Sequence, residues 1–144
     1  MALVVDASVA VRWLLDLEGA DRADAILQSD ERLIAPDLLI SEISSAVWKS
    51  VVFASTSADT AATAVGRAAE FFDEIVSSLV LKDHALQIAI ELRHAVYDCF
   101  YLSLAEQRDC QMVTADERLI ARCARSPYAK RIKPLVDAPA NRRR

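Results

Sequence analysis

Residues 3–15 read LVVDASVAVRWLL, an apolar run in which a carboxylate, Asp6, follows the first three residues. The apolar residues 3–5 predict a short buried strand, and the run after Ser8 predicts a helix with that serine as its N-cap. Asp6 therefore stands where the strand ends. Open parallel sheets bind ligands beyond the carboxyl ends of their strands, so this position indicates a functional carboxylate.

Predicted strands and helices alternate along the rest of the chain. The expected strands are residues 3–5, 32–35, 78–81, 111–114 and 131–136. The expected helices are residues 8–15, 20–28, 38–53, 60–75, 83–92, 98–106 and 117–125, with Asp37 and Asp83 as N-caps. This order predicts an α/β fold, in which a central short parallel sheet of four to five strands is flanked by helices on both faces.

The length of 144 residues suits one domain with one core, and 53% of the residues are hydrophobic. We expect the folded domain to span residues 1–137 and a disordered basic tail to span residues 138–144. The sequence has only two glycines, Gly19 and Gly66. It therefore lacks the GxGxxG and P-loop motifs, which weighs against dinucleotide or nucleoside triphosphate binding.

Targeting signals and paired cysteines are not evident in the sequence. No apolar run approaches the roughly 20 residues of a membrane span, and the N-terminus lacks the basic start of a signal peptide. The cysteines show no metal-binding spacing and are expected to be reduced core residues: Cys99, Cys110 and Cys123. We therefore expect a cytoplasmic protein without a membrane segment.

Charge is distributed unevenly along the chain. Residues 116–144 contain nine Lys and Arg against three Asp and Glu, whereas the preceding residues contain eight against eighteen. Arg118, Arg122 and Arg125 share one face of the predicted last helix. This basic segment either attracts a polyanion such as RNA or is an ordinary solvated surface, and the charge pattern leaves both open.

Four carboxylates occupy positions that could meet in space. Asp6 and Asp116 follow predicted strands, and Asp98 begins a helix whose apolar face carries Tyr101 at i+3. Glu42 lies at the border of the buried stripe of its helix. Each has an ordinary alternative, because aspartates cap helices and a glutamate at a stripe border is common. If the four do meet, their mutual repulsion favours a divalent cation with hard oxygen ligands.

These carboxylates and their surroundings resemble the PIN-domain ribonucleases, specifically the VapC toxins of bacterial toxin–antitoxin pairs. The matching segments are VVDASVAVRW, LLISEISSAVWK, YDCFYLSLAEQ and MVTADERL. Their order and spacing cover nearly the whole chain. The resemblance implies a PIN-like fold and a metal-dependent endoribonuclease that hydrolyses RNA phosphodiester bonds.

The resemblance also implies roles for particular residues. The catalytic carboxylates would be Asp6, Glu42, Asp98 and Asp116. Asp6, Asp98 and Asp116 would hold Mg²⁺ or Mn²⁺, while Glu42 would act through water or position the nucleophile. Ser8 and Thr114 would orient the carboxylates, water or phosphate from behind. No histidine is required, and His84 and His94 are expected to be surface or partner-facing residues.

The partners implied by the resemblance are an RNA substrate, a second copy of the chain and a VapB-like antitoxin. The antitoxin would wrap the toxin and block the acidic site. A hydrophobic groove between the first helices and residues 36–53 would take an antitoxin helix. The aromatic residues Trp13, Trp48, Phe53, Phe71 and Phe72 fit such a groove, and they equally fit the core. Arg118, Arg122 and Arg125 would grip RNA phosphates.

Other classes share single features of this sequence. A haloacid-dehalogenase-type phosphatase needs a second aspartate two residues after the first, where this chain has Ser8. A receiver domain needs a nearby acidic pair and a lysine after a late strand, and VTADERL offers neither. A non-catalytic PIN-like binding protein, in which the carboxylates are only caps, remains the alternative.

Overall fold

Five parallel strands form one sheet in the order β3-β2-β1-β4-β5. The structure is a computed structural model that describes residues 1–135. Central β1 pairs with β2 and β4 through registers such as Val4↔Ile34 and Val5↔Val113. The strands are β1 (Ala2–Val5), β2 (Arg32–Pro36), β3 (Glu74–Val76), β4 (Gln111–Thr114) and β5 (Ile132–Pro134).

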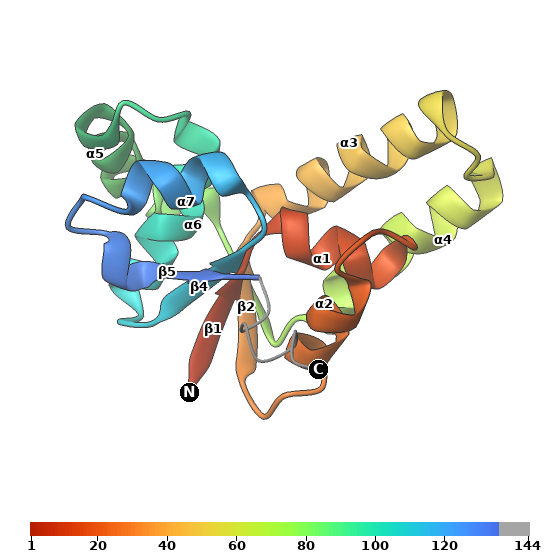
Figure 1. Cartoon of the computed structure of the whole chain (residues 1–144), viewed down its shortest axis with the longest axis horizontal. Helices are drawn as coiled ribbons and strands as arrows, with labels where there is room; N and C mark the ends of the chain where they lie inside the picture. Colours follow the sequence, from red (N-terminus) through yellow and green to blue (C-terminus); the bar gives the residue numbers. More distant parts are fainter. Residues whose placement is uncertain (136–144) are drawn as a thin grey trace, which may run out of the picture.

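Helices cover both faces of this sheet. They are α1 (Ala7–Leu14), α2 (Ala20–Leu27), α3 (Leu38–Phe53), α4 (Ala58–Arg67), α5 (Lys82–Leu92), α6 (Val96–Gln107) and α7 (Glu117–Cys123). Figure 1 shows α5, α6 and α7 on one side of the strands and α1 to α4 on the other. The parallel sheet enclosed by helices confirms the predicted α/β class.

The strand order creates a switch point between β1 and β4. From β1 the chain adds β2 and β3 towards one edge, and β4 and β5 later extend the sheet towards the other edge. The helices that follow β1 and β4 consequently lie on opposite faces, and the carboxyl ends of strands at such a switch point are where open α/β sheets bind ligands. Asp6 follows β1 directly, and Asp116 follows β4 after one intervening residue.

The core fills the space between the sheet and its helices. Val4 and Val5 of β1 and Leu102 of α6 are completely buried, and each contributes about 1.5–3 kcal/mol through burial. All three cysteine thiols are free and buried, as expected for reduced core residues. Burial raises the pKa of Cys99 to about 12, which keeps that thiol protonated. Among the described helices, none has both the length and the apolar composition needed to cross a membrane.

Several predicted boundaries were wrong. Residues 78–81 are not a strand: Ser78–Val80 form a 3₁₀ turn, and the third strand is Glu74–Val76. The helix predicted over residues 60–75 ends at Arg67, and a 3₁₀ turn follows it. The last helix ends at Cys123 rather than residue 125. The expected domain end at residue 137 and the expected tail over residues 138–144 lie outside the described residues.

Two of the three expected N-caps were also wrong, and the third, Asp37, is confirmed in position only. Ser8 lies inside α1, whose N-cap residue is Asp6, and that residue makes no side-chain cap hydrogen bond. Asp83 lies in the first turn of α5, whose N-cap residue is Leu81. Asp37 occupies the N-cap position of α3 without a side-chain cap hydrogen bond, and it accepts from the Ser78 hydroxyl instead. The carboxylates and hydroxyls at these positions therefore serve other contacts.

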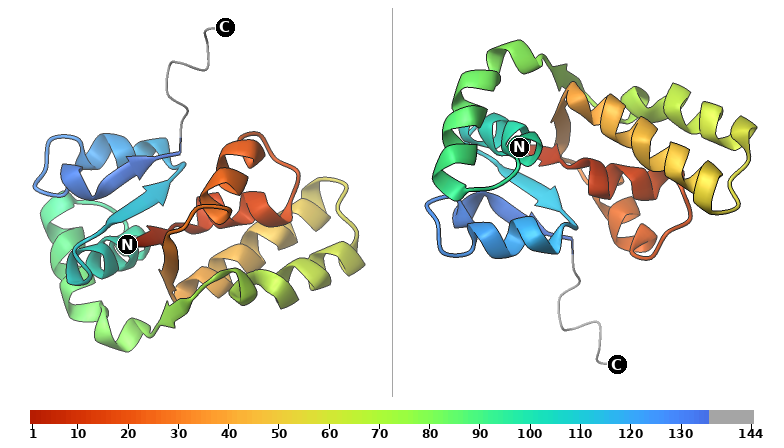
Figure 2. Two further views of the ribbon diagram at one scale, coloured as in Figure 1. Left: turned by 90° about the horizontal axis from the view of Figure 1, so that it is seen from below. Right: turned by 90° about the horizontal axis from the view of Figure 1, so that it is seen from above.

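Helices α3 and α4 extend beyond the sheet as a side-by-side pair, as both views of Figure 2 show. The aromatic residues that the sequence singled out separate into two groups around this pair. Trp13 packs on Phe71 and Phe72, with ring centroids 5.5 and 5.6 Å apart. Trp48 and Phe53 of α3 are 56% and 77% exposed, so they do not belong to the core.

Candidate active site

Asp6 is the most buried carboxylate of the candidate site. Asp6 is only 4% exposed, and two hydroxyl groups donate hydrogen bonds to the same oxygen of its carboxylate. Ser8 Oγ and Thr114 Oγ1 each donate to Asp6 Oδ2 at 2.7 Å. The residue directly after β1 is thereby fixed by the first turn of α1 and by the end of β4, and both hydroxyls occupy the orienting positions that the sequence predicted.

The surroundings of Asp6 disfavour its charge. Burial, opposed by the two hydroxyl hydrogen bonds and assisted by the negative charges of Asp98 and Asp116, raises the pKa of Asp6 to about 6. These interactions show that three of the four predicted carboxylates share one electrostatic neighbourhood. A cation bound there would relieve the repulsion and favour ionised Asp6.

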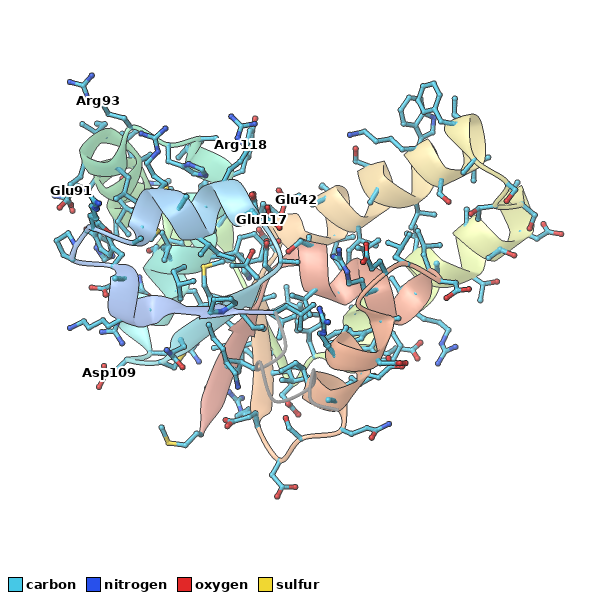
Figure 3. All side chains as sticks on the ribbon, viewed as in Figure 1. Glu42, Glu91, Arg93, Asp109, Glu117 and Arg118 are labelled. Carbon is cyan, nitrogen blue, oxygen red and sulfur yellow. The ribbon has the colours of Figure 1, made fainter. Side chains whose placement is uncertain are left out.

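Glu42 reaches the same neighbourhood from the first turns of α3. Tyr101 of α6 donates its hydroxyl to Glu42 Oε1 at 2.6 Å. Burial raises the pKa of Glu42 to about 7, opposed by the Tyr101 hydrogen bond and assisted by the charges of Asp6 and Asp98. Figure 3 shows Glu42 near the beginning of α3. Glu42 is therefore part of the cluster rather than an ordinary glutamate at a stripe border.

Replacing Tyr101 by phenylalanine is expected to raise the pKa of Glu42 above about 7, because the lost hydrogen bond stabilises the charged carboxylate. The free energy of unfolding should fall by about 1 kcal/mol. A carboxyl-carbon NMR titration of Glu42 measures the shift. The matched control is Tyr128→Phe, which removes a similar 2.7 Å hydrogen bond to Glu91 and should leave the Glu42 titration unchanged. An unchanged Glu42 titration in the Tyr101 variant would contradict this interpretation.

Asp98 lies in the first turn of α6, two residues after the helix begins. It makes no cap hydrogen bond; instead, its Oδ2 lies 2.6 Å from Nε2 of His94. The expectation that His94 is a surface or partner-facing residue was therefore wrong. Tyr101, on the same helix, is completely buried, as the spacing predicted.

Asp116 caps a helix, which is one of the two roles that the sequence left open. Its Oδ1 accepts from the backbone N–H groups of Arg118 and Leu119, so it does cap α7. Its own N–H donates to Thr114 Oγ1 at 3.0 Å, and the N–H of Ala115 donates to Ser8 Oγ at 3.0 Å. The turn after β4 is thus held against α1, which keeps Asp116 beside Asp6.

The four carboxylates share one hydrogen-bonding pattern. In each, described residues donate to one oxygen, while the other oxygen accepts no hydrogen bond from the described part of the chain. The oxygens without such a donor are Asp6 Oδ1, Glu42 Oε2, Asp98 Oδ1 and Asp116 Oδ2. Each side chain is thereby oriented by the protein and keeps one oxygen for a ligand.

The positions of the side chains do not by themselves make a complete metal chelate. Within residues 1–135, no group of three or more His, Cys, Asp and Glu side chains is placed to hold a metal ion. Mg²⁺ characteristically takes one or two protein carboxylates and completes its shell with water and substrate phosphate. The all-oxygen donor set suits that mode of binding, and the predicted ligand set of Asp6, Asp98 and Asp116 stays a prediction.

The predicted arginines do not all lie on one helix. Arg118 and Arg122 are exposed on α7, whereas Arg125 lies beyond its end, in the turn after Cys123. Figure 3 shows Arg118 on the same side of the molecule as Glu42. Only Arg118 and Arg122 therefore share a helix, and a role of the three arginines in RNA binding stays a prediction.

Sequence reasoning missed His94 and Tyr101 as partners of the carboxylates. The spacing from Asp98 to Tyr101 predicts that Tyr101 is buried, and the structure confirms this. Because the hydroxyl of a buried tyrosine needs a polar partner, the predicted burial was the signal that Tyr101 contacts a polar group. His94 stands four residues before Asp98, but a turn separates it from α6, so helical spacing gave no signal.

The family profile of the PIN domain matches residues 3–125 of this chain. The chain belongs to the PIN domain family. Ribonuclease VapC3 from Pyrobaculum aerophilum is 31% identical over 122 residues, which cover 83% of this chain and 92% of that relative. The family expectation drawn from the sequence is therefore confirmed.

Solved structures share the fold of this PIN domain. The crystal structure of PAE2754 from Pyrobaculum aerophilum has a TM-score of 0.67 and 24% identity, covering 85% of this chain and 79% of that one. A toxin–antitoxin complex from Klebsiella pneumoniae has a TM-score of 0.67 and 14% identity, covering 96% and 100%. VapBC2 from Rickettsia felis, bound to a promoter DNA fragment, also has a TM-score of 0.67, with 13% identity and coverage of 93% and 98%.

Proposed function

We propose that this chain is a metal-dependent endoribonuclease toxin of the VapC type, which hydrolyses RNA phosphodiester bonds. The observation that carries the proposal is the meeting of Asp6, Glu42, Asp98 and Asp116 at the switch point of the sheet. Their electrostatic interactions link them across four separate parts of the chain. The relationship to Ribonuclease VapC3 supports RNA as the substrate class.

Mg²⁺ or Mn²⁺ is the proposed cofactor, held by Asp6, Asp98 and Asp116. All three offer a carboxylate oxygen that described residues leave free, and hard cations prefer such donors. The cation, when bound, would make water more acidic and offset the negative charge of the phosphate. Ser8 and Thr114 keep Asp6 oriented for this task.

Glu42 is the proposed proton acceptor of the reaction. Its pKa of about 7 lies near neutral pH, where a carboxylate can take a proton from water more readily than an ordinary glutamate can. The Tyr101 hydroxyl donates to Oε1 and leaves Oε2 without a donor from the described residues. A non-catalytic scaffold would not require four carboxylates oriented in this way at one sheet edge.

Metal removal provides the direct test of the activity. The purified chain should cleave a mixed cellular RNA substrate with Mg²⁺ or Mn²⁺, lose that activity in excess EDTA and regain it when the cation is restored. Gel analysis of end-labelled RNA and sequencing of the new ends measure the cleavage. Cleavage that continues in EDTA would refute metal dependence, and no cleavage with any divalent cation would favour the non-catalytic alternative.

Arg118 and Arg122 are proposed to bind RNA phosphates beside the site. Each alanine replacement should weaken RNA binding, and each should lower the slope of log affinity against log salt by about 0.7. Fluorescence anisotropy with a cleavage-inactive background variant measures both quantities. Arg67→Ala is the matched control, because Arg67 lies on α4 and stacks on Phe71, 5.5 Å from its ring centre. Salt slopes that equal the parent value would contradict the assignment.

The proposed protein partners are a VapB-like antitoxin and a second copy of the chain. Two structural neighbours, from Klebsiella pneumoniae and Rickettsia felis, are toxin–antitoxin assemblies, which supports the first. The sequence predicts a hydrophobic groove between the first helices and residues 36–53, and this stays a prediction. A cavity of about 320 Å³ lies between α1 and α4, and Trp13, Arg67 and Phe71 are among the residues that line it. We propose this cavity as the antitoxin contact.

A further inference from the structure

The turn between α5 and α6 has an unusual backbone for its sequence. Arg93, at the end of α5, adopts the left-handed conformation with φ of 54°, which ordinarily favours glycine. The N–H of the next residue, His94, donates to the carbonyl of Ala89 at 3.2 Å and closes the helix end. This sharp turn directs the chain back so that His94 lies over the first turn of α6.

The His94 ring is mostly buried against Asp98. The His94 side chain is 11% exposed and that of Asp98 is 19% exposed, with 2.6 Å between Nε2 and Oδ2. When Asp98 is ionised, Nε2 of His94 is the donor of this hydrogen bond, because an ionised carboxylate only accepts hydrogen bonds. A ring that is held this closely and is this little exposed is unlike a solvated surface histidine.

The hydrogen bond determines how Asp98 faces the rest of the site. With Oδ2 held by His94, rotation of the carboxylate is restricted, and Oδ1 is the oxygen without a described donor. The charge of Asp98 acts on Asp6 and on Glu42, so the carboxylate lies on the side of α6 that meets both of them. Outer hydrogen-bond partners of this kind typically change metal affinity by 10- to 100-fold.

We propose that His94 is a positioning residue, which holds Asp98 Oδ2 so that Oδ1 is available to the divalent cation. The inference rests on the proposed metal-dependent function and adds a residue outside the four carboxylates. A purely structural role would instead make His94 a tie between α5 and α6, with no effect on cation affinity in the folded protein.

Mn²⁺ binding to the full chain, measured by isothermal titration calorimetry without RNA, tests the proposal. His94→Leu keeps an apolar volume and removes the donor, and it should weaken Mn²⁺ binding by about 10- to 100-fold. His94→Gln places an amide nitrogen near the position of Nε2, and it should stay within about threefold of the parent, because the donor rather than the ring is what matters. Circular dichroism confirms that each variant is folded.

A second pair of variants keeps the test decisive if the leucine variant does not fold. His94→Asn carries the same amide as His94→Gln on a side chain one methylene shorter, so it should not reach Asp98 and should bind Mn²⁺ weakly. Equal Mn²⁺ affinity in the Asn, Gln and parent chains would overturn the proposal. A parent chain that binds no Mn²⁺ would instead refute the metal-dependent function on which the inference rests.

Discussion

Replacing Asp98 or Asp6 by asparagine is expected to reduce RNA cleavage by about 100- to 1000-fold or more while the chain remains folded. Each change removes a negative charge from the shared carboxylate site and preserves the size of the side chain. An asparagine oxygen can still accept the hydrogen bonds now made by His94 or by Ser8 and Thr114. Cleavage rates of end-labelled RNA in saturating Mn²⁺ measure the loss.

Asp109→Asn is the matched control for these two variants. Asp109 precedes β4, so it lies at the opposite edge of the sheet from the site, and Figure 3 shows it far from Glu42. Its side chain is 91% exposed, and asparagine tolerates its left-handed backbone. The control should cleave RNA at the parent rate. Parent-like cleavage by the Asp6 or Asp98 variant would refute the catalytic assignment.

The same Asp6→Asn change is expected to stabilise the protein at neutral pH in metal-free buffer. The folded state raises the pKa of Asp6 from 3.8 to about 6, so its contribution to stability is full below pH 4 and is lost as pH rises through 6. Asparagine is neutral at every pH. The free energy of unfolding of the variant should therefore exceed that of the parent by an amount that grows from near zero at pH 4 to as much as about 3 kcal/mol at pH 8.

Urea unfolding in EDTA from pH 4 to pH 8 measures this trend. Glu74→Gln gives a control of opposite sign, because hydrogen bonds from Arg108 and Arg32 lower the pKa of Glu74 to about 2. The stability that Glu74 contributes is present above its ordinary pKa of 4.5 and is lost only in stronger acid. The free energy of unfolding of Glu74→Gln should therefore differ from that of the parent by a constant amount between pH 6 and pH 8. An Asp6 variant that is less stable at every pH would indicate a structural role for this carboxylate.

The sequence was most informative where strand ends determine the position of a side chain. Asp6 and Asp116 were predicted at one edge because parallel strands end at one edge, and the pairing of β1 with β4 makes them neighbours. The catalytic roles of Asp6, Glu42, Asp98 and Asp116 came from the family resemblance. The structure brings these four carboxylates together, and their functions await the experiments above.

The sequence was least informative where tertiary contacts outweigh local preference. Edge strand β3 was missed because its three residues continue a helical pattern, and pairing with β2 decides their conformation. Glu42 and Tyr101 come from different helices, so no local spacing joins them. The His94 contact depends on the left-handed Arg93, an uncommon conformation that a sequence pattern does not predict.

The position of β1 at the centre of the sheet has a consequence during protein synthesis. Asp6 is synthesised more than a hundred residues before its hydroxyl partner Thr114 and its acidic neighbour Asp116. A nascent chain on the ribosome thus carries an incomplete centre until β4 has been translated and inserted beside β1. Prematurely terminated fragments would lack this centre and, with it, the capacity to damage RNA in the cell that makes them.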